Sequence, residues 1–254
     1  MSTSTSNQQP WPVKQYIPRH QTWPYNPSDF TRQDNSPDDG FYSAPRFVTH
    51  IDDLAIASLR EYYDHVLPRK GKVLDFCSRR RGEGEVKVVG MGMNAAELER
   101  NPVLDGGRIL HDLNADPDVS RVLKTHGAIG DDDGEKLDAS TNVVSTDYLT
   151  SPVEVLHSLL HATKPGGRVH LTISNRCFPT KAIGRWLRVS EEERVQMVGD
   201  FLWFAGWRGI EIVELSDGGV QGGGGGSGGL KGFLAGMGMR GRDPVWVVRA
   251  VKEG

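Results

Sequence analysis

The stretch KVLDFCSRRRGEGEVKVVGMGMNAAEL, residues 72–98, decides the fold class. It holds two short apolar runs, at 72–76 and 86–89, which have the length and composition of buried strands. The second run leads to Asn94 with Glu97 three residues later, a spacing typical of the first turn of a helix. Buried strands that alternate with helices indicate a parallel sheet covered by helices.

The same alternation continues on both sides of this stretch. Upstream, apolar residues at helical spacing predict a helix over residues 51–66, with Thr49 and Asp52 as its capping pair and Pro68 after its end. Downstream, strands are expected at 108–111, 139–144, 168–173, 210–215 and 245–251, and helices at 116–125, from 151 to a KPGG break at 164–167, and from 190 onward. No strong helix separates the last two strands, which are therefore expected to pair antiparallel. The sequence predicts an α/β fold with a seven-stranded, mostly parallel sheet and helices on both faces.

Composition divides the chain into an N-terminal arm and one domain. Residues 1–45 hold seven of the 14 prolines and several aromatic residues, so we expect an arm that lies partly on the domain surface, with its first ten residues disordered. Residues 46–254 are expected to form one α/β domain. Within it, residues 216–242 contain 13 of the 31 glycines. We interpret this tract as a flexible loop and not a phosphate-binding one, because it follows the sixth strand and no helix signature comes after it.

Charge and composition exclude several classes of protein. With a formal net charge of −3 and no stripe of Lys and Arg, the chain shows no footprint for nucleic acid. No apolar run approaches the ~18 residues of a membrane span, and residues 1–10 are too polar for a signal peptide. Two cysteines are too few for a disulfide framework, and His157 and His161 lack a third ligand, so no metal site is expected. These features predict a cytoplasmic protein with reduced thiols.

Four polar segments follow the first four predicted strands, at 73–78, 90–94, 111–114 and 141–149. In open α/β sheets, ligands bind outside the carboxyl ends of the strands, at the point where the strand order reverses. Asp75 near the first strand end, a helix N-terminus after the second and Asp112 after the third suit the hydrogen-bonding groups of a nucleoside. The sequence therefore predicts a nucleoside-containing ligand at this edge.

These segments resemble the class I S-adenosylmethionine (SAM)-dependent methyltransferases, and more narrowly the type 11 methyltransferase-like proteins of fungi, plants and algae. The leader FYSAPRFVTH at 41–50 and the segment SNRCF at 174–178 belong to the same resemblance, which covers about residues 24–215 and the last strand. It implies a Rossmann-like fold, SAM as the cofactor, and methyl transfer. The acceptor is expected to be a small molecule, because no basic surface for nucleic acid is indicated.

The resemblance also implies roles for individual residues. Asp75 would face the amino group of the methionine part of SAM. The other implied cofactor positions are Cys77 and Ser78 in the first turn, Gly92, Met93 and Asn94 at the ribose, Asp112 and Leu113 at the adenine edge, and Thr141 and Asn142 beneath the methionine part.

The acceptor side is expected to be built from the leader and from the loops after the fourth and fifth strands. The candidate substrate residues are Tyr42, Arg46, Asp147, Asn175 and Arg176. The leader would fold over the cofactor as a lid. If a general base exists, His50 or Tyr148 is the candidate, and packing is the alternative role of each.

The sequence also departs from the family in two places. Arginines occupy positions 79–81, where most such enzymes place glycines, and only 16 residues lie between Asp75 and Gly92. Gly92 itself replaces the acid that many of these enzymes direct at the ribose. Two hypotheses therefore remain: a SAM-dependent methyltransferase acting on a small molecule, and a catalytically inactive relative that serves as a binding or interaction module.

Overall fold

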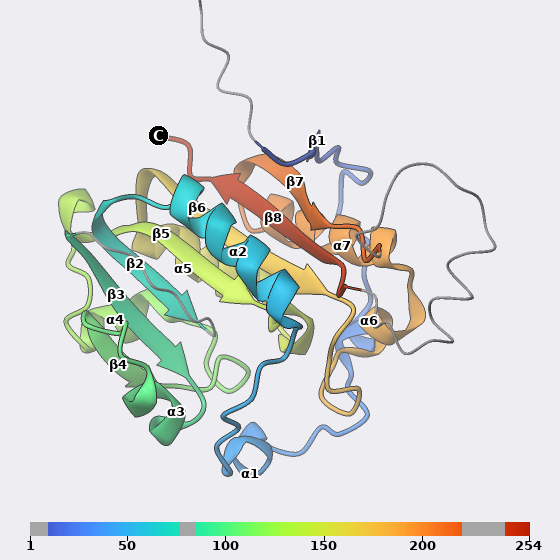
Figure 1. Ribbon diagram of the computed structural model, residues 1–254, viewed down its shortest axis with the longest axis horizontal. Coiled ribbons are helices and arrows are strands. Elements are labelled where there is room, and N and C mark those ends of the chain that lie inside the picture. Colours follow the sequence, from blue (N-terminus) through green and yellow to red (C-terminus); the bar gives the residue numbers. More distant parts are fainter. Residues whose placement is uncertain (1–9, 77–84, 220–241) are drawn as a thin grey trace, which may run out of the picture.

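The computed structural model describes residues 10–76, 85–219 and 242–254, and its centre is a single eight-stranded sheet (Figure 1). The strands are β1 Val13–Gln15, β2 Lys70–Phe76, β3 Glu85–Gly92, β4 Gly107–Leu110, β5 Leu137–Val143, β6 Thr163–Ser174, β7 Arg208–Ser216 and β8 Val245–Val251. Their spatial order is β1-β7-β8-β6-β5-β2-β3-β4. Strands β2 to β6 pair in parallel, whereas β8 is antiparallel to both β6 and β7. The expected α/β architecture and the antiparallel last pair are confirmed.

The expected number of seven strands is wrong, because the N-terminal arm adds β1 to the edge. Val13, Lys14 and Gln15 pair antiparallel with β7, and all three are exposed. Besides the backbone pairing, Gln15 donates through Nε2 to the Glu211 carboxylate of β7 at 2.9 Å. No alternation of apolar and polar side chains marks the segment in the sequence.

Helices cover both faces of the sheet, as expected. They are α1 Asp38–Tyr42, α2 Asp53–Val66, α3 Ala95–Arg100, α4 Val119–Thr125, α5 Pro152–Ala162, α6 Gly184–Arg188 and α7 Glu191–Phe204. Helix α2 packs on one face, where Leu59 and Tyr62 meet Val73 and Val247, while α4, α5 and α7 pack against the other face. Figure 1 shows α2 in front of the sheet and α5 and α7 behind it.

Several helix boundaries differ from the sequence prediction for local reasons. Helix α2 is capped by Asp52, whose side chain accepts the backbone N–H of Ala55 at 2.9 Å, so Thr49 is not part of the cap. Helix α4 begins at Val119 after its cap Asp118, later than the expected residue 116. The KPGG segment at 164–167 lies inside β6 and does not end α5. Helix α6 has only five residues and was not expected.

The strand order places a reversal between β2 and β5. From β2 the chain proceeds outward to β3 and β4, whereas β5 and β6 lie on the other side of β2. Asp75 near the end of β2 pairs in register with Gly90 of β3 and with Thr141 of β5. A crevice outside the carboxyl ends of these strands is where doubly wound sheets bind ligands.

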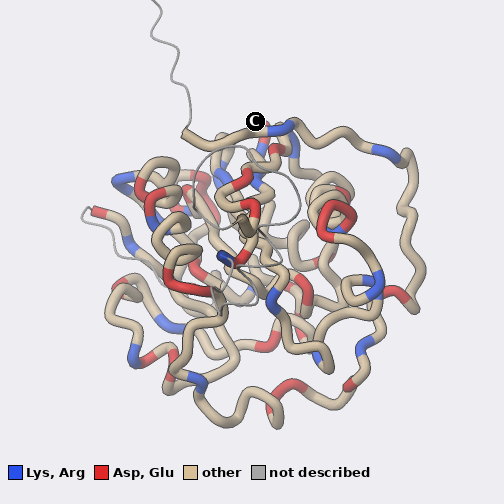
Figure 2. Tube along the Cα trace, turned by 45° about the vertical axis from the view of Figure 1, so that its right-hand side comes forward, with Lys and Arg blue, Asp and Glu red and all other residues tan. Residues whose placement is uncertain are grey.

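The arm lies against the domain through buried polar contacts. The hydroxyl groups of Tyr16 and Tyr25 both donate to the carboxylate of Asp200, which is 1% exposed. Lys181 is fully buried and forms ion pairs with Asp34 at 3.0 Å and Asp38 at 3.1 Å. The first nine residues and most of the glycine-rich tract lie outside the described residues. Figure 2 shows cationic and anionic positions interspersed along the described chain.

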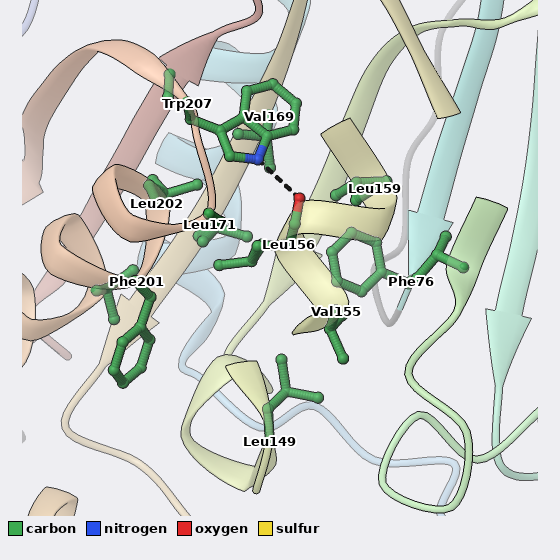
Figure 3. Packing of buried hydrophobic residues seen from close by; sticks show 14 of the residues in the cluster. Phe76, Leu149, Val155, Leu156, Leu159, Val169, Leu171, Phe201, Leu202 and Trp207 are labelled. Carbon is green, nitrogen blue, oxygen red and sulfur yellow. Dashed lines mark hydrogen bonds between the residues drawn. The ribbon is translucent and has the colours of Figure 1, made fainter. Parts of the chain in front are cut away.

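The larger apolar cluster lies between the sheet and helices α4, α5 and α7. Figure 3 shows Trp207 at its upper end, where the indole N–H donates to the carbonyl oxygen of Leu156 at 2.9 Å. Trp207 is fully buried, and tryptophan has the largest side chain of any residue type in this cluster. The indole therefore joins the end of α7 to the middle of α5.

Replacing Trp207 by alanine is expected to lower the free energy of unfolding by about 3–5 kcal/mol, because it leaves a cavity in a close-packed region. Urea unfolding followed by circular dichroism measures this change. Trp203→Ala is the matched control, since Trp203 is partly exposed and Arg208 stacks on its ring at 4.3 Å. Equal losses in the two variants would contradict the assignment of Trp207 to the core.

Candidate functional site

A cavity of about 610 Å³ opens at the carboxyl ends of β2, β3, β4 and β5. This volume lies within the range of roughly 300–1,000 Å³ that is usual for small-molecule sites. The cavity brings together many of the residues expected from the sequence. They are Tyr42, Arg46, His50, Asp75, Gly92, Met93, Asn94, Asp112, Leu113, Asn142, Tyr148 and Arg176.

Three expected residues do not line this cavity. Thr141 is buried within β5, and Asp147 is buried in the turn after β5, at 3% and 2% exposure. Asn175 is exposed after the end of β6. Cys77 and Ser78 lie outside the described residues, as do the arginines at 79–81.

Asp75 is a buried carboxylate at the cavity wall. It is 3% exposed and occupies the last but one position of β2. Tyr63 of α2 lies close enough that, after burial, the negative charge of Asp75 raises the pKa of the Tyr63 hydroxyl. That hydroxyl also shares a hydrogen bond with Thr172 at 3.0 Å. A carboxylate in such a place favours a cationic or hydrogen-bond-donating ligand group.

Two asparagines that were expected to contact a cofactor line the cavity and also hold neighbouring segments together. Asn142 donates through Nδ2 to the carbonyl oxygen of Phe76 at 2.9 Å and accepts from the Thr146 hydroxyl at 3.0 Å. Asn94 caps α3 by accepting the backbone N–H groups of Ala96 and Glu97. Its Nδ2 donates to the carbonyl oxygen of Tyr42 at 2.8 Å. Both side chains therefore act as positioning groups.

The leader between α1 and α2 forms one wall of the cavity. Its residues from Arg46 to Ile51 all line the cavity. The backbone N–H of Arg46 donates to the Glu97 carboxylate at 2.5 Å, which ties the leader to the first turn of α3. Figure 1 shows α1 and α3 at the edge toward which the arrows of β2 and β3 point.

The sequence interpretation missed the contribution of α2 to this wall. Ile56, Leu59, Arg60 and Tyr63 all line the cavity, and their spacing places them on one helical face. That periodicity is visible in the sequence. However, nothing local distinguishes a helical face that packs on a sheet from one that also borders a ligand.

The two candidate bases, His50 and Tyr148, differ in their ability to accept a proton. The pKa of the His50 imidazole is lowered, chiefly because burial disfavours its charged form. The negative charge of Glu97 opposes this shift, whereas the positive charge of Arg46 adds to it. The imidazole is therefore neutral at physiological pH and able to accept a proton. Burial, followed by the charge of Asp147, raises the pKa of the Tyr148 hydroxyl. That hydroxyl accepts the backbone N–H of Phe178 at 2.8 Å, so it is suited to donate a hydrogen bond and not to remove a proton.

The residues present fit SAM. Asp75 offers a carboxylate for an ammonium group, and Asp112 offers one at the end of β4, where its Oδ1 also accepts the N–H of Asn114 at 2.8 Å. Met93 and Leu113 supply apolar surface beside these carboxylates for a flat base. The described residues contain no group of three or more His, Cys, Asp or Glu side chains that could hold a metal ion.

Comparison with known proteins gives similarities of structure alone. No model of a known protein family matches the sequence. None of the curated proteins matches it either. The structure is similar to that of a SAM-dependent methyltransferase from Archaeoglobus fulgidus, with 16% identity, a TM-score of 0.48 and coverage of 79% of this chain and 94% of that one.

Two further solved structures show the same kind of similarity. The cyclase SpnF gives 13% identity and a TM-score of 0.48, over 85% of this chain and 91% of that one. Phosphoethanolamine N-methyltransferase 2 from Haemonchus contortus, solved in complex with SAM, gives 13% identity and a TM-score of 0.41, over 79% of this chain and 52% of that one. These likenesses assign no role to any residue of this chain. Across the described ranges, no helix has the length and apolar character needed to cross a membrane.

Asp147 is the most strongly perturbed carboxyl group near the site. Burial raises its pKa from 3.8 to about 8, and within the described part of the chain its Oδ2 atom has no hydrogen-bond partner. The unfolded chain therefore releases this proton above about pH 4, whereas the folded chain keeps it until about pH 8. Because the unfolded state binds fewer protons across this window, this group lowers the stability of the fold as pH rises.

Asp147→Asn is expected to remove this pH dependence. Its stability relative to the natural chain should increase between pH 5 and pH 8, by up to about 1.4 kcal/mol per pH unit. Urea unfolding at several pH values measures the difference, with Asp131→Asn as a control, because the Asp131 side chain is 91% exposed. Parallel pH profiles for Asp147→Asn and the natural chain would show that this carboxyl group does not titrate in that window.

Proposed function

We propose that this chain binds SAM and transfers its methyl group to a small molecule. The observation that carries the proposal is the cavity itself. It lies at the reversal of strand order, and its wall includes a carboxylate near the end of β2, Asp75, and one after β4, Asp112. This arrangement matches the two polar ends of a nucleoside joined to an amino acid.

Each part of the cavity would have a separate role. Asp75 would bind the amino group of the methionine part, and Asp112 would bind the polar edge of the nucleoside. Gly92, Met93 and Leu113 would lie against the ribose and the base. Asn94 and Asn142 would act indirectly, because their side chains hold α3 and the ends of β2 and β5.

Catalysis would rest on alignment and on proton removal. Bound SAM supplies a methyl group on a positively charged sulfur. The leader and α2 would form one wall beside the reactants, while Arg46, Tyr148 and Phe178 would position the acceptor. The neutral imidazole of His50 would accept the proton of an acceptor that carries one on the attacking atom.

One observation favours the alternative of a catalytically inactive binding module. Strands β2 and β3 are parallel neighbours, yet only residues 77–84 connect them. Parallel connections usually need about a dozen residues or more. A binding module of this kind would retain the cavity without supporting methyl transfer.

Calorimetric titration with SAM and with S-adenosylhomocysteine is expected to show binding of both. Asp75→Asn should weaken each by about tenfold or more, because a hydrogen bond to a charged group is worth about 1.5–3 kcal/mol. Asp131→Asn should leave both affinities unchanged. Absence of binding at millimolar concentration would overturn the proposed cofactor. Binding without transfer of a labelled methyl group to any small molecule tested would favour the binding module.

Gly92→Asp is expected to tighten binding of S-adenosylhomocysteine several-fold. Among the described residues, a Cβ atom at Gly92 would meet the Leu98 side chain alone, at 3.5 Å, which is ordinary van der Waals contact. A carboxylate there would lie at the end of β3 and accept hydrogen bonds from ribose hydroxyls. Gly92→Asn is the neutral control and should gain less. If aspartate bound no better than asparagine, the ribose would not lie at the end of β3.

A further inference from the structure

Arg46 lies in an unusual position in the cavity wall. Its guanidinium stacks on the ring of Phe41 at 4.4 Å and faces Phe178 at 5.3 Å. Its Nη2 atom donates to the carbonyl oxygen of Phe41 at 2.8 Å. Among the described residues, no Asp or Glu forms an ion pair with this guanidinium, although it is only partly exposed.

The other charged groups near Arg46 already have partners. Asp38 is paired with Arg32 at 2.8 Å and with Lys181 at 3.1 Å. Arg176 is paired with Asp243 at 2.9 Å. The Glu97 carboxylate accepts the backbone N–H of Arg46 and not its side chain. The guanidinium therefore brings to the cavity a positive charge with which none of these groups forms an ion pair.

The chemistry of the guanidinium selects the kind of group that would pair with it. It carries five N–H donors in a planar fork, and the hydrogen bond to the carbonyl oxygen of Phe41 uses one of them. A carboxylate matches this fork with two parallel hydrogen bonds. The flanking rings fix the plane of the guanidinium and offer apolar surface on either side, which suits a ligand with a carboxylate on an apolar body.

The carboxylate of Glu97, which accepts the backbone N–H of Arg46, is the negative group next to the leader. The titratable groups on the Tyr148 side of Arg46 add no negative charge at neutral pH. Asp147, buried behind Tyr148, keeps its proton up to about pH 8. Desolvation keeps His50 neutral, and its ring stands edge-on to Phe178 at 5.5 Å. The Tyr148 hydroxyl accepts the N–H of Phe178, so its own proton remains a donor toward the cavity. A cationic acceptor would meet the unpaired charge of Arg46, whereas an anionic one would neutralise it.

We propose that Arg46 recognises a carboxylate on the methyl acceptor, so that the substrates of this site are small carboxylic acids with an apolar body. The proposal rests on the proposed methyl transfer, because the ligand is a methyl acceptor only if that reaction takes place. The recognition of a carboxylate depends only on Arg46 and the rings of Phe41 and Phe178 that flank it.

Matched acid and amide probes test this inference. Benzoate and benzamide differ in charge but hardly in shape, and saturation-transfer NMR titrations measure the affinity of each for the full chain, with and without S-adenosylhomocysteine. The natural chain should bind benzoate at least about tenfold tighter than benzamide. Arg46→Gln should abolish this preference. Arg46→Lys, which keeps the charge and loses the planar fork, should retain part of it.

Arg208→Gln is the matched control. The Arg208 guanidinium also stacks on an aromatic ring, Trp203 at 4.3 Å, and also donates to backbone carbonyls, but it does not line the cavity. This variant should keep the full preference for benzoate. Circular dichroism of each variant shows whether it is folded, and Arg46→Lys provides the decisive comparison if Arg46→Gln is not.

The outcomes separate this inference from the proposed function. Equal affinity for acid and amide in the natural chain, or a preference that survives in Arg46→Gln, would overturn the role of Arg46. Loss of the whole preference in Arg208→Gln would also overturn it. If S-adenosylhomocysteine does not bind while the preference for benzoate depends on Arg46, then the proposed methyl transfer fails and carboxylate recognition stands.

Discussion

The buried carboxylate of Asp38 is the contact on which the shape of the site depends. It is 3% exposed and is reached by Arg32, by Lys181 and by the Nδ2 atom of Asn114 at 2.9 Å. Burial of a carboxylate is costly unless its partners compensate for the lost hydration. Here the partners come from the arm, from the segment after β6 and from the segment after β4. A single charge therefore fixes the leader against both halves of the sheet.

The polar residues at the strand ends divide into two groups. Asn94, Asn114 and Asn142 each form hydrogen bonds through both Oδ1 and Nδ2 to other groups of the chain. They hold loops in place. Asp75, Asp112 and Arg46 line the cavity with charged groups, and those are the groups that select a ligand. The sequence shows both kinds of residue in the same motifs, and only the hydrogen-bond partners distinguish them.

The sheet was predictable because its signals are local. The strand at 245–251 was expected with the bounds that β8 has, since a buried apolar run flanked by polar residues carries its own evidence. Strand β1 and helix α6 were not expected, because one is exposed on all three residues and the other is a single short turn. Both elements depend on partners that are far away in the sequence, and for β1 this partner is β7.

The same distinction separates the correct and missed parts of the site. Residues at strand ends could be assigned to a common edge, because parallel strands place their carboxyl ends together. Thr141 and Asn142 are neighbours in β5, and of the two only Asn142, one residue nearer the carboxyl end of the strand, lines the cavity. The sequence motif contains both residues and does not show which of them lines the cavity. Tyr63 and Glu97 were missed for a related reason, because their place at the cavity follows from how α2 and the leader pack.

The acceptor side of the cavity combines groups that would each be unfavourable in a packed core. Arg46 is a partly buried cation, and Asp147 is a buried carboxyl group without a partner for Oδ2 among the described residues. At Asp147, a hydrophobic replacement of similar volume would bury the same surface without the polar cost. At Arg46, the guanidinium contacts the rings of Phe41 and Phe178 but has no ion pair among the described residues. The two groups also have a common electrostatic consequence. One adds a positive charge and the other withholds a negative one at neutral pH, so both bias the same end of the cavity toward an anion. An anionic ligand would therefore meet the positive charge of Arg46 without opposition from Asp147, which is the charge arrangement that recognition of a carboxylate needs.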